Sequence, residues 1–74
     1  MLTENQLNKL DCMNYHVTTS LNCYYITSGL SGLKKLCKEY KLNFNDISKE
    51  LLNSGYIEGK VNGDNDMLLQ IAMV

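Results

Sequence analysis

The chain has 74 residues, of which 45% are hydrophobic and 20% charged, and its formal net charge is −1. A chain this short builds one small domain, expected to span residues 1–74, with little interior to enclose a deep substrate cavity. The hydrophobic fraction excludes wholesale disorder, and no apolar run approaches the roughly 20 residues of a membrane span. We therefore expect a cytoplasmic globular domain without a membrane segment or a signal peptide.

The charges are unevenly distributed along the chain. All basic residues are lysine, so arginine, the usual bidentate partner of guanine edges and phosphates, is absent. Residues 31–49 carry a net charge of +3, whereas residues 50–74 carry −3. The missing arginine and the lack of an overall basic excess weigh against sequence-specific DNA recognition.

Three cysteines occur without a Cys-x-x-Cys pair: Cys12, Cys23 and Cys37. Their odd number favours reduced thiols in the cytoplasm over a disulfide framework. A zinc site is the alternative, because Cys12 and His16 would share a helix face and the other two cysteines would complete the ligands. The poor ligand spacing favours instead small residues in the core, so we expect no metal and no cofactor.

The amino-terminal segment predicts a helix followed by a strand. Thr3-Glu4-Asn5-Gln6 has the form of a capping box and starts a helix over about residues 3–14. β-branched and aromatic residues then predict one strand over about residues 16–27, interrupted near Asn22. Alternation would place the following side chains on one face: Val17, Thr19, Leu21, Cys23 and Tyr25. The other face would carry Thr18, Ser20, Asn22 and Tyr24.

Two further helices are expected in the middle of the chain. Ser31 is the expected N-cap of the first, which ends near Lys41 and carries an apolar stripe at helical spacing: Leu33, Leu36, Cys37 and Tyr40. The next helix runs from about Phe44 to Ser54, with Asn43 or Asn45 as its cap. Gly55 is expected to close this helix in the left-handed conformation.

The remaining residues predict a hairpin. A strand from Tyr56 to about Val61 is followed by the turn signal Asn62-Gly63-Asp64-Asn65 and a last strand from Met67 to Val74. The last strand is apolar on both faces apart from Gln70. If one face packs on the core through Leu69, Ile71 and Met73, the other points outwards with Leu68, Ala72 and Val74.

The order helix-strand-helix-helix-strand-strand predicts an α+β domain of three helices and a small antiparallel sheet. Residues 33–40 and 44–52 fit a helix-turn-helix, and the hairpin fits a wing. This order, together with the run from Asp46 to Ile57, resembles the winged helix-turn-helix superfamily, although the early strand is longer than is usual there. An unrelated α+β arrangement of the same elements is the alternative.

The resemblance implies either DNA binding through the third helix and the wing or a protein-docking role. By position, DNA contacts would fall on Asn43, Asn45, Asp46, Ser48 and Lys49, with wing contacts at Lys60, Asn62 and Asn65. The aspartates Asp46, Asp64 and Asp66 would repel phosphate. A stripe of lysines on the second helix is either a solvated face or a contact for phosphate or an acidic partner: Lys34, Lys35, Lys38 and Lys41.

The chain shows no phosphate-binding glycine loop, nucleophile motif or close metal cluster, so we expect neither an enzyme nor a small-molecule substrate. The last strand needs cover, from the first helix, a second copy of the chain or a partner subunit. We expect a protein interface to include Tyr24, Tyr56, Leu68, Ala72 and Val74. Tyr15 is a further aromatic anchor or, equally, a buried structural residue.

These observations favour a non-catalytic module that docks on a partner protein or forms a homodimer. The alternative is a winged-helix regulator that binds DNA. Asparagine- and lysine-rich chains without arginine are typical of mobile elements of AT-rich bacteria. The expected partner is therefore a nucleic-acid-processing enzyme of a mobile element or phage. This chain would act as its accessory subunit or as its inhibitor.

Overall fold

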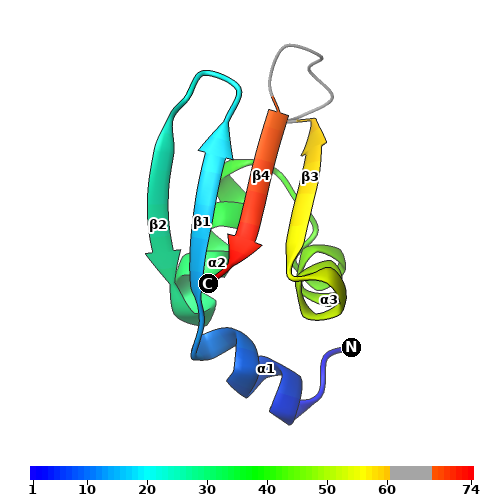
Figure 1. Cartoon of the computed structure of the whole chain (residues 1–74). Helices are drawn as coiled ribbons and strands as arrows, with labels where there is room; N and C mark the ends of the chain where they lie inside the picture. The colour runs from blue at the N-terminus through cyan, green and yellow to red at the C-terminus, as the bar shows by residue number, and fades with distance from the viewer. Residues whose placement is uncertain (61–67) are drawn as a thin grey trace.

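The computed structural model describes residues 1–60 and 68–74, of which Lys60 is described by its main chain. The chain forms the following elements in order: α1 (Glu4–Asp11), β1 (Asn14–Thr19), β2 (Tyr24–Ser28), α2 (Gly29–Glu39), α3 (Phe44–Ser54), β3 (Tyr56–Lys60) and β4 (Leu68–Met73). The strands form one antiparallel sheet in the order β2-β1-β4-β3 (Figure 1). The expected α+β class, with three helices and an antiparallel sheet, is confirmed.

The single strand expected over residues 16–27 is wrong, because the segment folds into the β1–β2 hairpin. The Thr19 amide donates to the Cys23 carbonyl at 3.0 Å, and the Asn22 amide donates to the Thr19 carbonyl at 3.1 Å. Asn22 takes a φ of 60°, a left-handed conformation that its short polar side chain tolerates. The expected interruption near Asn22 is therefore a chain reversal, and the element order contains one strand more than expected.

Local capping signals define two of the helices. The capping box at the start of α1 is confirmed, since the Gln6 amide donates to Thr3 Oγ1 at 3.2 Å and the Thr3 amide to Gln6 Oε1 at 2.8 Å. α1 nevertheless ends at Asp11, because Asn14 already belongs to β1. α3 has its expected bounds: the Asn43 side chain accepts from the Asp46 amide at 3.1 Å, and Gly55 closes the helix with a φ of 82°.

The start of α2 differs from the expectation. α2 begins at Gly29, so Ser31 lies inside its first turn and is not the N-cap. Ser28 holds the cap position without a side-chain hydrogen bond. Instead, Asp11 Oδ1 at the end of α1 accepts from the Leu30 amide at 3.0 Å. A carboxylate from another helix therefore caps α2 and also complements the positive end of its dipole.

The core lies between the sheet and the helices. α2 and α3 cover one face of the sheet and α1 packs at its lower end (Figure 1). Tyr15, Val17 and Thr19 of β1 point towards the helices, as the burial alternation along β1 shows. Their neighbours in the core include Leu33, Leu36, Leu51, Leu69 and Ile71.

The described residues include no helix that is both long and apolar enough to cross a membrane. The turn expected at Asn62-Gly63-Asp64-Asn65 lies outside the described residues. The strands on either side of it are paired as expected, with Tyr56 opposite Ala72 and Lys60 opposite Leu68. This pairing places the end of the chain in the middle of the sheet, between β1 and β3.

Candidate functional site

The sheet face turned away from α2 and α3, called the outer sheet face below, gathers apolar and aromatic side chains from all its strands. Alternation along each strand assigns to it Tyr24, Ile26, His16, Thr18, Leu68, Gln70, Ala72, Tyr56 and Glu58. Tyr24, Ile26 and Tyr56 keep 56%, 56% and 57% of their surface exposed. Such exposure is high for three large side chains that share one face of a sheet.

The strand register brings these side chains into one row across the sheet. His16 lies opposite both Ile26 and Ala72, and Ala72 lies opposite Tyr56. Because the alanine is small, a hollow of about 240 Å³ opens there, lined by His16, Thr18, Tyr56, Gln70 and Ala72 with main-chain neighbours. The hollow is large enough to receive one side chain of a partner.

A hydrogen bond fixes one of the tyrosines on this face. The Tyr24 hydroxyl and His16 Nδ1 lie 2.6 Å apart. Their ring centroids are 5.4 Å apart with an interplanar angle of 70°, which is the edge-to-face arrangement that aromatic rings prefer. The Tyr24 side chain is therefore held in place before any partner binds.

The residues expected at a protein interface lie largely together. Tyr24, Tyr56, Leu68 and Ala72 all belong to the outer sheet face. Val74 follows β4, is 62% exposed and donates its amide to the Asn14 carbonyl at 2.9 Å. Tyr15 does not join them, because its side chain is fully buried in the core.

Two residues of the outer sheet face were not expected there. From the sequence, Ile26 is assigned to neither face, and His16 is a candidate zinc ligand or a histidine near a helix end. The alternation that placed Thr18 and Tyr24 on one face extends to both residues. The alternation of the sequence therefore already indicated that both residues share the face of Thr18 and Tyr24.

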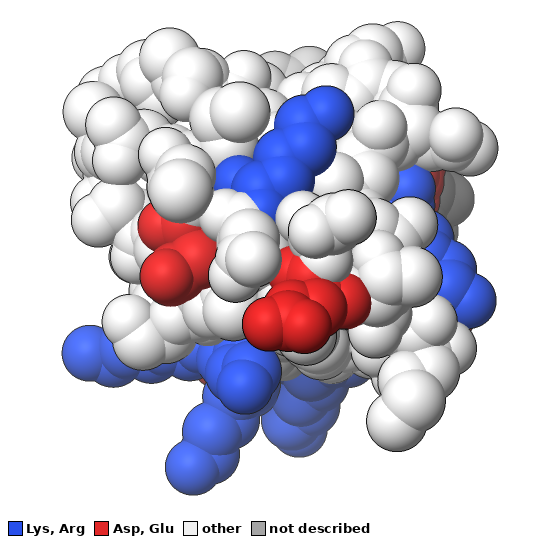
Figure 2. Space-filling model, turned by 90° about the horizontal axis from the view of Figure 1, so that it is seen from below, with Lys and Arg blue, Asp and Glu red and all other residues white. Residues whose placement is uncertain are grey.

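The lysines of α2, and Lys41 just beyond its end, lie on the helical side of the molecule. Lys34, Lys38 and Lys41 form an exposed group, called the lysine surface below, and Lys34 Nζ stands 5.6 Å from the centre of the Phe44 ring. Figure 2 shows lysine side chains projecting together from one side of the molecule. Lys35 is turned elsewhere, because it lines a groove beside β2.

The other residues expected to contact nucleic acid are scattered. Ser48 is fully buried, so its assignment as a contact residue is wrong. The Asn43 side chain is engaged in capping α3, whereas Asn45 is exposed. Lys49 borders a hollow beside Met1 at the start of the chain. Of the three contacts expected in the wing, Lys60 ends β3, and Asn62 and Asn65 lie outside the described residues.

The cysteines and His16 do not form a metal site. No three of the His, Cys, Asp and Glu side chains in the described residues come together in a group that could hold a metal ion. Cys12 and Cys23 are exposed, whereas Cys37 is buried in the core. Burial raises the pKa of the Cys37 thiol, which keeps this sulfur protonated and unreactive.

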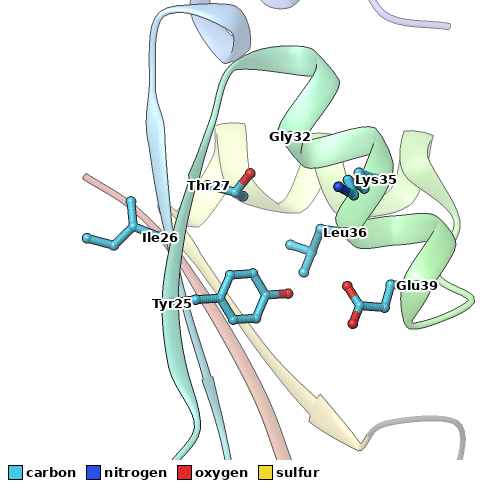
Figure 3. A pocket seen from close by; sticks show the side chains of 7 residues that line it. All are labelled: Tyr25, Ile26, Thr27, Gly32, Lys35, Leu36 and Glu39. Atoms are coloured by element: carbon cyan, nitrogen blue, oxygen red, sulfur yellow. The ribbon is translucent and has the colours of Figure 1, made fainter.

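A groove of about 230 Å³, called the β2–α2 groove below, separates β2 from α2 (Figure 3). Tyr25 and Thr27 point into it from β2, and Lys35, Leu36 and Glu39 border it on α2. Burial, with smaller contributions from Tyr40 and Glu39, raises the pKa of the Tyr25 hydroxyl, so this group is neutral at physiological pH.

Comparisons of this chain with protein-family models, with curated proteins and with solved structures found no match. Its function is therefore inferred from its own surfaces. These are the outer sheet face, the lysine surface and the β2–α2 groove.

Proposed function

We propose that this protein is a non-catalytic docking module that binds a partner protein through its outer sheet face. One observation carries the proposal: Tyr24, Ile26, Tyr56 and Leu68 lie exposed together on a sheet face that no helix of the described residues covers. A sheet normally buries an apolar face against a second layer of structure. Here the helices supply that layer on one side, and a partner protein would supply it on the other.

The local geometry suits tight contact with a protein. Tyrosine side chains are frequent at the energetic centres of protein interfaces because they bury a large area at low entropic cost. The hydrogen bond to His16 holds Tyr24 in place, and the hollow above Ala72 offers a complementary site for a partner side chain. A surface ordered before binding loses less conformational entropy on association.

The distribution of charge favours a protein over a nucleic acid at this face. Glu58 is the charged residue among the described side chains of the outer sheet face, and Lys60, opposite Leu68 in the register, adds one cation position at the end of β3. A phosphate backbone needs cations within reach, and the lysine surface lies on the helical side instead. That the partner is a nucleic-acid-processing enzyme of a mobile element or phage stays a prediction.

The test is a double variant, Tyr56→Asp with Leu68→Asp, compared with Leu21→Asp. Leu21 is a matched control, because it is 69% exposed in the β1–β2 turn and lies outside the outer sheet face. Proteins retained from the native host by the wild-type chain would be identified, purified and titrated by calorimetry. We expect the double variant to weaken binding at least about tenfold, since charges would enter a desolvated contact, and the control to bind like wild type. Equal binding by all three chains would overturn the proposal.

A second candidate is a winged-helix regulator that binds DNA. The lysine surface along α2 and just beyond its end supports it, as do the succession of α2 and α3 and the pairing of β4 with both β1 and β3. The burial of Ser48 and the engagement of the Asn43 side chain in capping α3 weigh against it. A regulator would also require contacts from the segment between β3 and β4.

Duplex binding measured by fluorescence anisotropy tests this second candidate. If it is correct, affinity falls steeply with salt, because phosphate contacts release counterions. Changing Lys34, Lys38 and Lys41 to glutamate then abolishes binding, whereas Lys9→Glu on α1 has a smaller effect. Absent or salt-insensitive binding to a duplex pool would exclude the regulator.

A further inference from the structure

The two edge strands of the sheet, β2 and β3, differ in how they are protected. On β3, Glu58 lies in the edge strand, and the Ser54 hydroxyl donates to the Tyr56 carbonyl at 2.7 Å. By contrast, β2 has the sequence Tyr-Tyr-Ile-Thr-Ser, with neither a charged residue nor a proline. Edge strands that stay unpaired usually carry such protection, so β2 is the edge that is ready to pair.

The hydrogen-bond pattern of the hairpin shows which groups of β2 are free. The Thr19 amide donates to the Cys23 carbonyl at 3.0 Å, and antiparallel pairing alternates from there. Tyr25 and Thr27 therefore direct their amide and carbonyl groups at β1, whereas Ile26 directs its groups away from the sheet. The register sets Ile26 opposite His16, between two hydrogen-bonded pairs, so the amide and carbonyl of Ile26 face the free edge.

The helix beside this edge carries a pair of opposite charges. Lys35 and Glu39 are one helical turn apart on α2, and both border the β2–α2 groove. Figure 3 shows the two side chains next to the groove, with Tyr25 and Thr27 pointing towards α2 and Ile26 pointing the opposite way. A strand that pairs with β2 therefore lies close to both Lys35 and Glu39.

We propose that β2 pairs with β2 of a second copy of this chain in antiparallel orientation, which gives a two-fold symmetric homodimer. A two-fold axis that reverses β2 also reverses α2, so Lys35 of each copy faces Glu39 of the other. The charges at this edge are thus complementary to themselves, as an isologous interface requires. Pairing through one edge closes the assembly at two copies, because β3 is not an equivalent edge.

The dimer leaves the outer sheet face uncovered and joins two such faces side by side. Dimerisation is therefore independent of the docking function, and an experiment that overturns one proposal leaves the other standing. The double variant Tyr56→Asp with Leu68→Asp should dimerise like wild type, which separates the two experiments.

The first test is sedimentation equilibrium of the wild-type chain and of Ile26→Pro. Proline removes the Ile26 amide hydrogen, which points to the free edge, so the pairing of β1 with β2 keeps its bonds. We expect the wild type to dimerise and the variant to be monomeric with unchanged circular dichroism. A wild-type chain that is monomeric up to its solubility limit would overturn the proposal.

The second test is a charge exchange that does not depend on the proline variant folding. Lys35→Glu and Glu39→Lys should each weaken dimerisation about tenfold, since each places two like-charged pairs across the axis. An equimolar mixture of the two variants should recover association as a heterodimer visible by native mass spectrometry. Recovery only on mixing shows that neither substitution weakens dimerisation by disturbing the folding of α2. Lys38→Glu, on the lysine surface, is the matched control and should dimerise like wild type. Dimerisation insensitive to both exchanges, or no recovery on mixing, would overturn the proposal.

Discussion

Tyr15 is the largest fully buried side chain, and its hydroxyl donates to the Leu10 carbonyl in the last turn of α1 at 2.5 Å. The Leu10 carbonyl also accepts from the Met13 amide at 3.4 Å, so the tyrosine adds a second, shorter bond and joins α1 to β1. Tyr15→Phe would leave the carbonyl buried without this donor. We expect a loss of about 1–2 kcal/mol in the free energy of unfolding, measured in urea. An unchanged midpoint would show that the bond contributes nothing to stability.

Ser48 illustrates the opposite case at the residue scale. Its side chain is fully buried, and its Oγ has no hydrogen-bond partner among the described residues. Ser48→Ala removes a desolvated polar atom and improves helix propensity, so we expect a gain of up to about 1 kcal/mol in stability. A raised melting temperature would confirm this, whereas a lowered one would mean that the hydroxyl is satisfied in solution.

At the scale of the elements, α2 depends on a cap from outside its own segment. Asp11→Ala removes the oxygen that accepts from the Leu30 amide, and should cost about 1 kcal/mol. Asp11→Asn keeps an acceptor at the same place and should cost less. Thermal unfolding of the two variants distinguishes them, and equal losses would contradict a capping role.

The close approach of α2 to β2 depends on Gly32. A Cβ added there would overlap the Thr27 side chain. Alanine favours a helix over glycine, yet this overlap should make Gly32→Ala destabilising by about 1–3 kcal/mol. In a Thr27→Ala background the loss should shrink markedly, because the overlapping hydroxyl is gone. Additive effects in this double-mutant cycle would rule out the contact as the cause.

The elements that sequence reasoning placed well are those with local signals. Asn43 and Gly55 fix the ends of α3, and the Thr3 capping box fixes the start of α1. The reversal between β1 and β2 was missed because the turn contains neither glycine nor proline, and Asn22 takes the left-handed conformation in their place. The cap of α2 was misplaced because its acceptor, Asp11, belongs to α1.

The same contrast applies to the candidate site. Leu68 and Ala72 were placed on the outer face because they alternate with Leu69 and Ile71, which are buried. The winged-helix resemblance implies that Ser48 is an exposed DNA-contact residue. Its spacing from Phe44 and Leu51 instead places it on the inner helix face, and the structure follows the spacing.

At the scale of the whole molecule, two tyrosines link stability to alkaline pH. Burial, with a smaller contribution from Asp11, raises the pKa of Tyr15 to about 12, and burial also raises the pKa of Tyr25. Above the ordinary tyrosine pKa of 10.0 the unfolded chain loses these protons first, so stability falls as the pH rises from 10 towards 12. Urea midpoints across this range should fall less steeply for Tyr15→Phe than for wild type. Parallel curves would assign the loss to other groups.

The molecule also separates two kinds of surface. The outer sheet face carries aromatic and apolar side chains, and the lysine surface lies on the helical side. The lysines cluster along the chain as well, but the sequence does not show which apolar residues lie on the opposite side. That division underlies the choice of a protein partner over a nucleic acid for the outer sheet face.

The sequence by itself determined the three helices of the described residues and which segments form strands, because caps and side-chain periodicity act over a few residues. It also determined the small interior and the opposite charges of residues 31–49 and 50–74. Only the tertiary structure decided that β4 lies between β1 and β3 and that β2 is an unprotected edge. The physical reason is that strand pairing and layer packing join residues far apart in the chain, and these contacts alone select which apolar faces are covered.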